Sequence, residues 1–254
     1  MPIERIWLDV PYAEKDKAKG AGARWDPENK RWYAPRLGMR ELDHWAPRPD
    51  VPELLPGEDR SFGSGLFVDL VPSSCWFTNV RWCVDQRDWG RLRNMINTRA
   101  GNRCEVCSGN SGGLEAHERW SFDDRTMVQT LRRLVCLCAD CHTVTHFGLA
   151  QVKGRDEEAF AHLRAVTGMS DREARNHVQD AFTVWERRSH VDWTLDLGIL
   201  TGAGITVQPP PEAASRANLA SHTLQRERPS ASAETSATPR ISGFGDQLMR
   251  ILGF

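Results

Sequence analysis

The sequence lacks any long apolar stretch. No segment approaches the roughly 18 consecutive apolar residues that a membrane-spanning helix needs, and residues 1–5 lack the features of a signal peptide. Net charge is also nearly absent, with a formal value of −1, so bulk charge neither favours nor excludes a nucleic-acid partner. We therefore expect no membrane partner. The 254 residues have room for one or two domains, and nothing in their pattern indicates an oligomeric state.

Cysteine is scarce, and its total of seven is odd, which argues against a disulfide scaffold. Four of the seven form two C-x2-C pairs, Cys104 with Cys107 and Cys138 with Cys141. Two thiolates two residues apart can face one ion, and a second such pair completes a tetrahedron around zinc. We expect a structural zinc there and a reducing, cytoplasmic compartment. The other three are interpreted as ordinary buried thiols: Cys75, Cys83 and Cys136.

The two cysteine pairs are separated by residues 108–137, a longer stretch than the about 15–20 residues usual between such pairs. They must therefore bracket an inserted element. This element carries a His-Glu pair, His117 and Glu118, and the second cysteine pair is followed by His142 and His146. With i, i+4 spacing, the last two imidazoles lie on one face of a helix.

This order of cysteine pair, inserted histidine and second cysteine pair followed at once by histidine resembles the HNH (ββα-metal) endonuclease family, over residues 66–200. In the zinc-ribbon branch of that family, the insertion is a β-hairpin and the second pair starts a helix. The resemblance implies an α+β fold, DNA as the partner and a structural zinc at the four cysteines. It also implies a catalytic divalent metal (Mg, Mn, Ni or Zn) held by His117, His142 and His146.

Two positions depart from the family pattern. Glu118 stands where the family has its water-activating histidine, and Arg133 stands where it has a central asparagine. A histidine suits the role of base because its pKa lies near neutrality. A glutamate, with an ordinary pKa of about 4.3, is a weaker base unless burial or a metal-bound water compensates.

Two hypotheses therefore stay open. In the first, the protein is a metal-dependent endonuclease that hydrolyses DNA phosphodiester bonds, with His117 and Glu118 as catalytic residues. In the second, it is a catalytically degenerate HNH-fold zinc protein that binds DNA or recruits another protein. The three histidines would then only cap and pack a zinc ribbon.

The N-terminal residues have a β-α-β-β pattern. The string Gly-Ala-Arg-Trp-Asp at residues 22–26 resembles the core of a small domain of unassigned function that occurs in plasmid primases, with a match over residues 8–35. Basic and aromatic residues alternate here and can hold phosphates and stack on bases. The open alternative is that the aromatics form the core of a small domain and the lysines its solvated face. The candidate nucleic-acid contacts are Lys15, Lys19, Arg24, Trp25 and Trp32.

Composition divides the chain further. Residues 1–45 form the small N-terminal module, and the proline-rich residues 46–65 read as a linker. Residues 66–200 form the HNH-like zinc domain with helical additions. Residues 201–240 are poor in large apolar groups and are predicted to be disordered. Residues 241–254 have helical apolar spacing and are interpreted as a docking helix for a protein partner, or as a helix that folds back on its own domain.

Within the zinc domain, we expect strands over 66–70 and 76–83 and helices over 85–98, 156–166 and 170–188. Asp85 is a candidate N-cap for the first helix, and Ser170 with Glu173 forms a capping box for the last. Arginines on and after the first helix can contact phosphates, with a solvated helix face as the alternative. They are Arg91, Arg99 and Arg103.

Overall fold

The computed structural model describes residues 5–212, 214–216, 218–219 and 222. The chain divides into two compact units, unit 1 (residues 1–50) and unit 2 (residues 51–254). Both combine helices with a small sheet, which confirms the predicted α+β class. Among the described helices, none has the length and apolar character to cross a membrane. The predicted tail beyond residue 222 and the predicted helix 241–254 lie outside the described residues.

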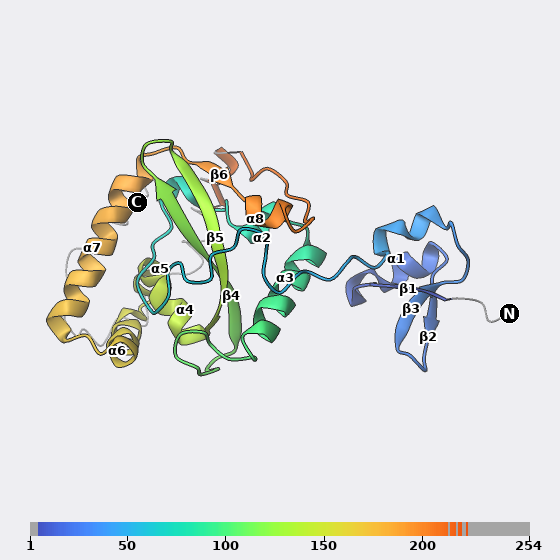
Figure 1. Ribbon diagram of the computed structural model, residues 1–254, viewed down its shortest axis with the longest axis horizontal. Coiled ribbons are helices and arrows are strands. Elements are labelled where there is room, and N and C mark those ends of the chain that lie inside the picture. Colours follow the sequence, from blue (N-terminus) through green and yellow to red (C-terminus); the bar gives the residue numbers. More distant parts are fainter. Residues whose placement is uncertain (1–4, 213, 217, 220–221, 223–254) are drawn as a thin grey trace. The chain divides into compact units, whose positions relative to one another are not determined.

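The described residues of unit 1 form a three-stranded antiparallel sheet with one α-helix (Figure 1). The strand order β1-β3-β2 places β3 in the centre. One face of the sheet and the helix enclose a core that includes Leu8, Ala18 and Leu42. The elements are β1 (Ile6–Leu8), α1 (Lys15–Gly20), β2 (Arg24–Asp26) and β3 (Arg31–Ala34).

Unit 2 is built around a long hairpin. Strands β4 (Leu114–Asp123) and β5 (Val128–Cys138) pair antiparallel, and the short β6 (Thr194–Asp196) pairs parallel with β5. The side chain of Asp123 accepts hydrogen bonds from the N–H groups of the turn that follows, including Arg125 at 2.8 Å. In the order β4-β5-β6, β4 is an edge strand. One of its long sides is therefore free to line a site.

A bulge in the hairpin changes which residues of β5 share a face. Arg119 pairs with Arg133 and Trp120 with Leu131, so Arg132 is the extra residue on β5. Successive strand residues point to opposite faces, but the bulge shifts this alternation by one. Leu131 and Leu134 therefore belong to the same hydrophobic cluster.

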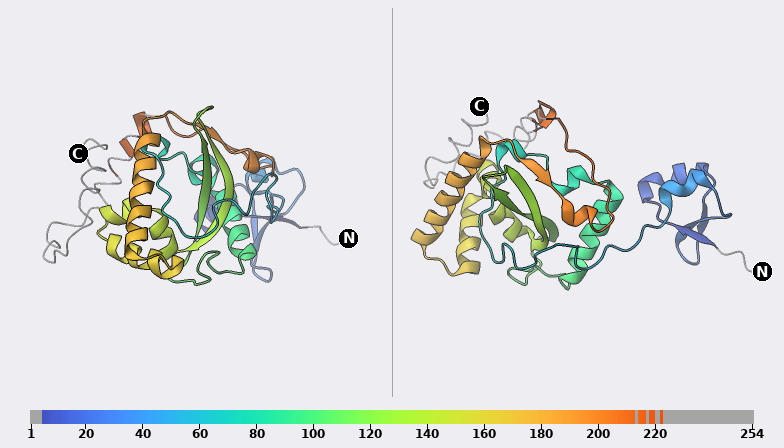
Figure 2. Two further views of the ribbon diagram at one scale, coloured as in Figure 1. Left: turned by 60° about the vertical axis from the view of Figure 1, so that its left-hand side comes forward. Right: turned by 45° about the horizontal axis from the view of Figure 1, so that its top comes forward.

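Two groups of helices cover the two faces of the hairpin (Figures 1 and 2). One group packs with Val135 and Leu137, and the other packs with Leu134 and Cys136. The first group is α4 (Ala139–Thr145), α5 (Phe147–Val152), α6 (Asp156–Thr167) and α7 (Asp171–Ser189); the second is α2 (Val80–Cys83), α3 (Gln86–Arg99) and α8 (Gly198–Thr201).

Local signals at the helix ends agree with the sequence. Asp85 caps α3 by accepting from the N–H of Asp88 at 2.8 Å. Ser170 and Glu173 form the predicted capping box of α7. Helix α6 ends at Gly168, whose φ of +73° is left-handed and favours glycine.

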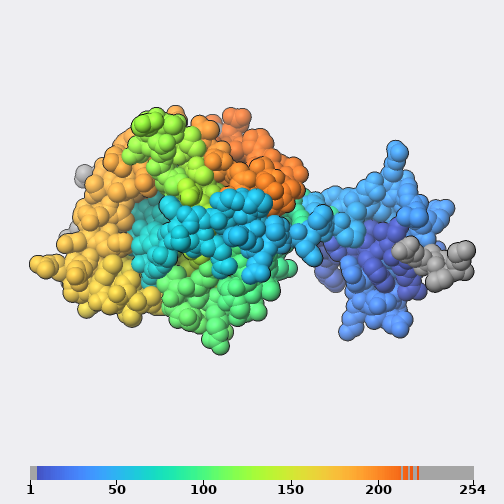
Figure 3. All heavy atoms as spheres, viewed as in Figure 1, coloured from blue at the N-terminus to red at the C-terminus, as the bar shows by residue number. Residues whose placement is uncertain are grey.

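Most of the segment predicted as a linker packs on unit 2. Residues 51–65 belong to this unit and lie across its surface in Figure 3. The side chain of Leu55 is fully buried. The start of the predicted tail is also packed: Ile205 is buried, and the N–H of Gln208 donates to Cys83 O at 2.7 Å. A few apolar residues are enough to hold a segment in place when they pack on the surface of a folded domain. Composition alone therefore underestimates how far both segments are ordered.

The two strands predicted before α3 do not form. Residues 66–70 have no regular secondary structure and pair with no strand among the described residues, although Leu66 and Val68 are buried against the helices α4–α7. Residues 76–83 end in the short helix α2 instead. Asn79 caps this helix by accepting from the N–H of Trp82 at 3.3 Å, a local bond that competes with strand formation.

Candidate metal centres and nucleic-acid surfaces

The four paired cysteines come together at one end of the hairpin. Their sulfur atoms all lie within 4.8 Å of one another, and Cys107 Sγ lies 3.5 Å from Cys138 Sγ. A tetrahedral zinc with bonds of about 2.3 Å requires sulfur–sulfur distances of roughly 3.8 Å, so this set fits zinc. The hydrogen bond between Cys141 and Cys104 lowers the pKa of Cys104 and raises that of Cys141, so it favours one thiolate in the group. The group can therefore hold a structural metal ion, as predicted.

Glu105, inside the first cysteine pair, ties that pair to the hairpin. Its N–H donates to Cys136 O at 2.8 Å, and its carboxylate accepts from the N–H of Cys136 at 3.0 Å. Arg133 donates to the same carboxylate at 2.6 Å and to the carbonyl of Arg60. Arg133, one of the two departures from the HNH pattern that the sequence resembles, is thus buried in an ion pair that supports the cysteine cluster.

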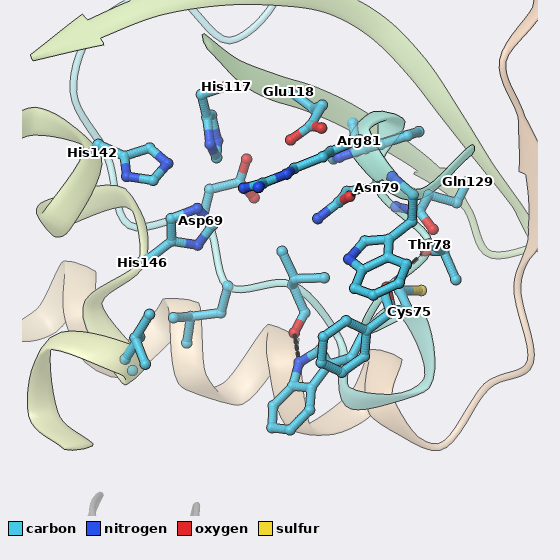
Figure 4. Close-up of a pocket in the computed structure, with 18 of the residues that line it drawn as sticks. Asp69, Cys75, Thr78, Asn79, Arg81, His117, Glu118, Gln129, His142 and His146 are labelled. Atoms are coloured by element: carbon cyan, nitrogen blue, oxygen red, sulfur yellow. Dashed lines mark hydrogen bonds between the residues drawn. The ribbon is translucent and has the colours of Figure 1, made fainter. Parts of the chain in front are cut away.

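A second group of ligand-type residues joins the hairpin to helix α4. His117 comes from β4, His142 from α4 and His146 from the junction of α4 and α5. One ring nitrogen from each lies within 4.8 Å of the others. Figure 4 shows the three rings converging on one space. The structure therefore brings together the three histidines that the sequence predicted as ligands.

These histidines are suited to bind a metal. Burial holds the pKa of His117 well below its usual value and lowers the pKa of His146 to about 3, so both rings are neutral at neutral pH. Both ring nitrogens of His117 are buried and, among the described residues, have no hydrogen-bond partner. Such orphaned polar atoms are costly in a protein interior. A metal ion bound by the neutral imidazoles would satisfy one of them.

Glu118 reaches the same pocket from the other face of the hairpin. Residues 117 and 118 of a strand point to opposite faces. Because β4 is an edge strand, one pocket along its free side is lined by both His117 and Glu118 (Figure 4). The Glu118 carboxylate accepts from the N–H of Val80 at 3.1 Å. Burial raises the pKa of Glu118 to about 7.

The pocket also receives polar residues that the sequence analysis missed. Asp69, Asn79 and Arg81 point into it beside the histidines (Figure 4). The guanidinium of Arg119 is fully buried, 3.5 Å from Asp69 Oδ2, and its charge lowers the pKa of the histidines further. Nothing in the sequence marks Asp69, Asn79 and Arg81, because residues 66–81 are irregular and lie far from the motifs along the chain.

The three arginines predicted as phosphate contacts lie in different environments in the structure. Arg99 is unavailable, since its side chain is fully buried in a two-armed ion pair with Glu58 at 2.7 Å. Arg91 is bound to Asp88 at 2.6 Å and is 26% exposed. Arg103 is exposed and donates to Ser108 O at 3.3 Å. The prediction for Arg99 is wrong because its long side chain turns inward, against a segment that sequence spacing does not reveal.

In unit 1, the predicted contacts lie on two sides of the sheet. Trp32 packs against the core, as the core alternative expected. Trp25 is 48% exposed, and its ring meets that of Trp32 edge-on at 5.5 Å. Lys15 lies over the Tyr12 ring, and Lys19 is exposed on α1.

The face of the sheet opposite the core carries further aromatic and basic residues. We call Arg5, Trp7, Arg24, Arg31 and Tyr33 the sheet-face set. Trp7 and Arg24 are both register partners of Tyr33, so the three form a row across the strands. The guanidinium groups of Arg5 and Arg31 lie over the Tyr33 and Trp7 rings, 5.2 and 5.5 Å from the ring centres. Arg5 and Arg31 also form ion pairs with Asp26 and Asp9, which offset part of their charge. The face still combines aromatic surface with basic groups.

Comparison with known proteins gives matches to parts of the chain. Residues 5–47 match a family described as a domain of unknown function, DUF5710. A DNA primase TraC of Escherichia coli is 51% identical over 45 residues, which are 17% of this chain and 4% of the primase. Another DNA primase TraC of Escherichia coli is 56% identical over 118 residues, which are 44% of this chain and 8% of the primase. No solved structure matches.

These matches confirm the resemblance of the N-terminal segment to a module of plasmid primases. The chain spans less than a tenth of the length of either primase. The activity of those proteins therefore does not transfer to this one.

Proposed function

We propose that unit 2 is a metal-dependent endonuclease of the HNH (ββα-metal) type, which hydrolyses phosphodiester bonds in DNA. The observation that carries this proposal is the convergence of His117, His142 and His146, with both ring nitrogens of His117 buried and unpartnered among the described residues. The cysteine cluster supports it, because its ligands bracket the same hairpin and helix. The names of the partial relatives, both DNA primases, favour DNA as the substrate.

The residues of the pocket have different roles in the proposed reaction. A divalent ion held by the three histidines would polarise the scissile phosphate and stabilise the leaving oxygen. The Glu118 carboxylate, held by the N–H of Val80, takes the proton of the attacking water. Arg81 extends into the pocket and offers a positive charge to a phosphate oxygen (Figure 4).

A second candidate function rests on the same glutamate. One carboxylate oxygen of Glu118 is already occupied by the N–H of Val80, at the start of α2. This contact favours a structural role for Glu118, as in a catalytically degenerate fold that keeps its zinc and binds DNA or recruits a protein. The two candidates differ in whether the protein cuts DNA.

The test is nicking of supercoiled plasmid by the full-length protein with added Mg or Mn. We expect about two metals per chain and nicking that Glu118→Gln lowers by roughly 10²–10⁴-fold, the usual contribution of a general base. His117→Ala should remove the second metal and all nicking while keeping zinc. Matched controls are His190→Ala and Glu157→Gln, which change exposed residues outside the pocket. One zinc per chain with persistent DNA binding and no nicking would establish the second candidate instead.

For unit 1, we propose nucleic-acid binding through the sheet-face set. The arginines stacked on the partly exposed rings of Trp7 and Tyr33 combine aromatic surface with basic groups, which matches a strand of bases and phosphates. Unit 1 would then hold the DNA that unit 2 acts on.

A further inference from the structure

The histidine cluster occupies only one end of the pocket. The cavity, of about 370 Å³, continues along the free side of β4 to a group of aromatic residues around α2. In Figure 4 the histidines lie at one end, whereas Thr78 and Gln129 lie at the other, beyond Asn79. A ligand whose charged group reaches the histidines therefore extends its remaining part among aromatic rings.

Two of these rings are not needed for the core. Phe77 and Trp82 both line the pocket, and neither belongs to the hydrophobic clusters formed by the described residues. Trp82 is 43% exposed, and the two rings meet edge to face with centres 5.4 Å apart. Phe77 has a φ of +61°, a left-handed conformation that is strained for a bulky residue. Strain of this kind concentrates at functional sites.

Amide groups lie beside the rings. Asn79 uses its side-chain oxygen to cap α2, and its NH₂ group faces the pocket (Figure 4). Gln129 is buried in the wall at the aromatic end. Flat rings for stacking, with amide donors and acceptors at their edges, are the means by which proteins hold an unpaired base.

We propose that this pocket binds a nucleobase of the substrate strand, so that the enzyme acts on single-stranded or locally unpaired nucleic acid. A base in an intact duplex is stacked and paired, and it must leave the stack to enter a side pocket. This inference rests on the proposed function, which places the cleaved phosphate at the histidine end of the pocket. The base pocket adds the class of substrate.

The test compares two short single strands of equal length, an oligothymidylate and a fully abasic strand with the same phosphates. Their affinities for the full-length protein are measured by fluorescence anisotropy without added divalent metal, so that binding does not depend on hydrolysis. We expect the oligothymidylate to bind more tightly. Trp82→Ala should weaken its binding by about tenfold and leave the abasic strand unchanged, because stacking on one ring is lost.

Two variants control for folding and for unspecific effects. Trp82→Phe keeps a ring and should retain most of the preference for bases. Leu54→Ala removes another exposed apolar side chain, 57% exposed and outside the pocket, and should change neither affinity. A strand carrying 5-iododeoxyuridine should also crosslink under light to the peptide that contains residues 76–82.

The outcomes separate this inference from the proposed function. A base preference that depends on Trp82, in a protein that cuts no DNA, would support the pocket and reject the nuclease. Cleavage with equal affinity for both strands, or a base preference that Trp82→Ala leaves intact, would overturn the pocket and leave the nuclease standing. Crosslinks confined to unit 1 would also overturn it.

Discussion

At the scale of single residues, the ion pair between Glu58 and Arg99 explains much about unit 2. Both side chains are fully buried, and the two residues are 41 positions apart. Arg99 also donates to Leu134 O at 2.6 Å, and Glu58 accepts from the N–H groups of Leu134 and Leu55. The pair therefore joins α3, β5 and residues 51–65. An arginine that looks free in the sequence becomes part of the interior.

This pair leads to a stability prediction. Glu58→Gln should lower the free energy of unfolding of unit 2 by about 3–5 kcal/mol near neutral pH, because Arg99 is left buried without a counter-charge. Urea titration of the full-length protein measures this. Glu158→Gln, which breaks an exposed pair with Arg155, should cost less than about 1 kcal/mol. Equal losses in the two variants would contradict the interpretation.

The effect of Glu58 should depend on pH. Burial raises the pKa of Glu58, but the hydrogen bonds from Arg99, Leu134 and Leu55 and the charge of Arg99 outweigh it, so the net pKa is lowered. Because the pKa is lowered in the folded state, the carboxylate contributes its full stabilisation of the fold at pH values above its unfolded-state pKa of about 4.3. This stabilisation is lost as the pH falls through the folded-state pKa of Glu58. The difference between wild type and Glu58→Gln should therefore shrink in acid.

At the scale of elements, the cysteine cluster joins three parts of the chain to one another. Cys104 and Cys107 follow α3, Cys138 ends β5 and Cys141 lies in α4. The loop before β4 packs on the same place: Gly112 has a φ of +66°, and a Cβ there would lie 2.7 Å from the Cβ of Ala139. A metal at the cluster should therefore fix the helix that carries His142 relative to the hairpin that carries His117.

Removing one cysteine tests this role. Cys138→Ala should lose the structural zinc and lower the free energy of unfolding of unit 2 by several kcal/mol, because metal binding contributes directly to folding. Zinc content by mass spectrometry and thermal unfolding of the purified protein report both effects. The control is Cys75→Ala, a buried cysteine outside the cluster, which should keep its zinc. Full zinc content in Cys138→Ala would refute the assignment.

At the scale of the whole molecule, the proposed function predicts separate contributions of the two units to DNA binding. Arg31→Gln, in the sheet-face set, should weaken binding of single-stranded DNA by the full-length protein and reduce its salt dependence by about 0.7 in the logarithmic slope per lost phosphate contact. Lys19→Gln, on α1, is the matched comparison within unit 1. A loss confined to Lys19→Gln would place the contact on the helix side instead of the sheet face.

Short-range signals in the sequence predicted a good part of this protein. The spacing of Cys104 with Cys107 and of Cys138 with Cys141 predicted one cluster, and the described cysteines form it. The i, i+4 histidines share a helix end, and the capping box opens α7. These features depend on atoms a few residues apart, so local geometry decides them.

The tertiary structure alone decided what meets across long distances. It buried Arg99 against Glu58, fixed residues 51–65 on unit 2, and brought Asn79 and Trp82 beside Glu118 in one pocket. The sequence by itself determined the two close cysteine pairs, the i, i+4 histidines and the helix caps, because each depends on residues only a few positions apart. The composition of the pocket depends on which faces the folded hairpin leaves open, and that is a property of packing.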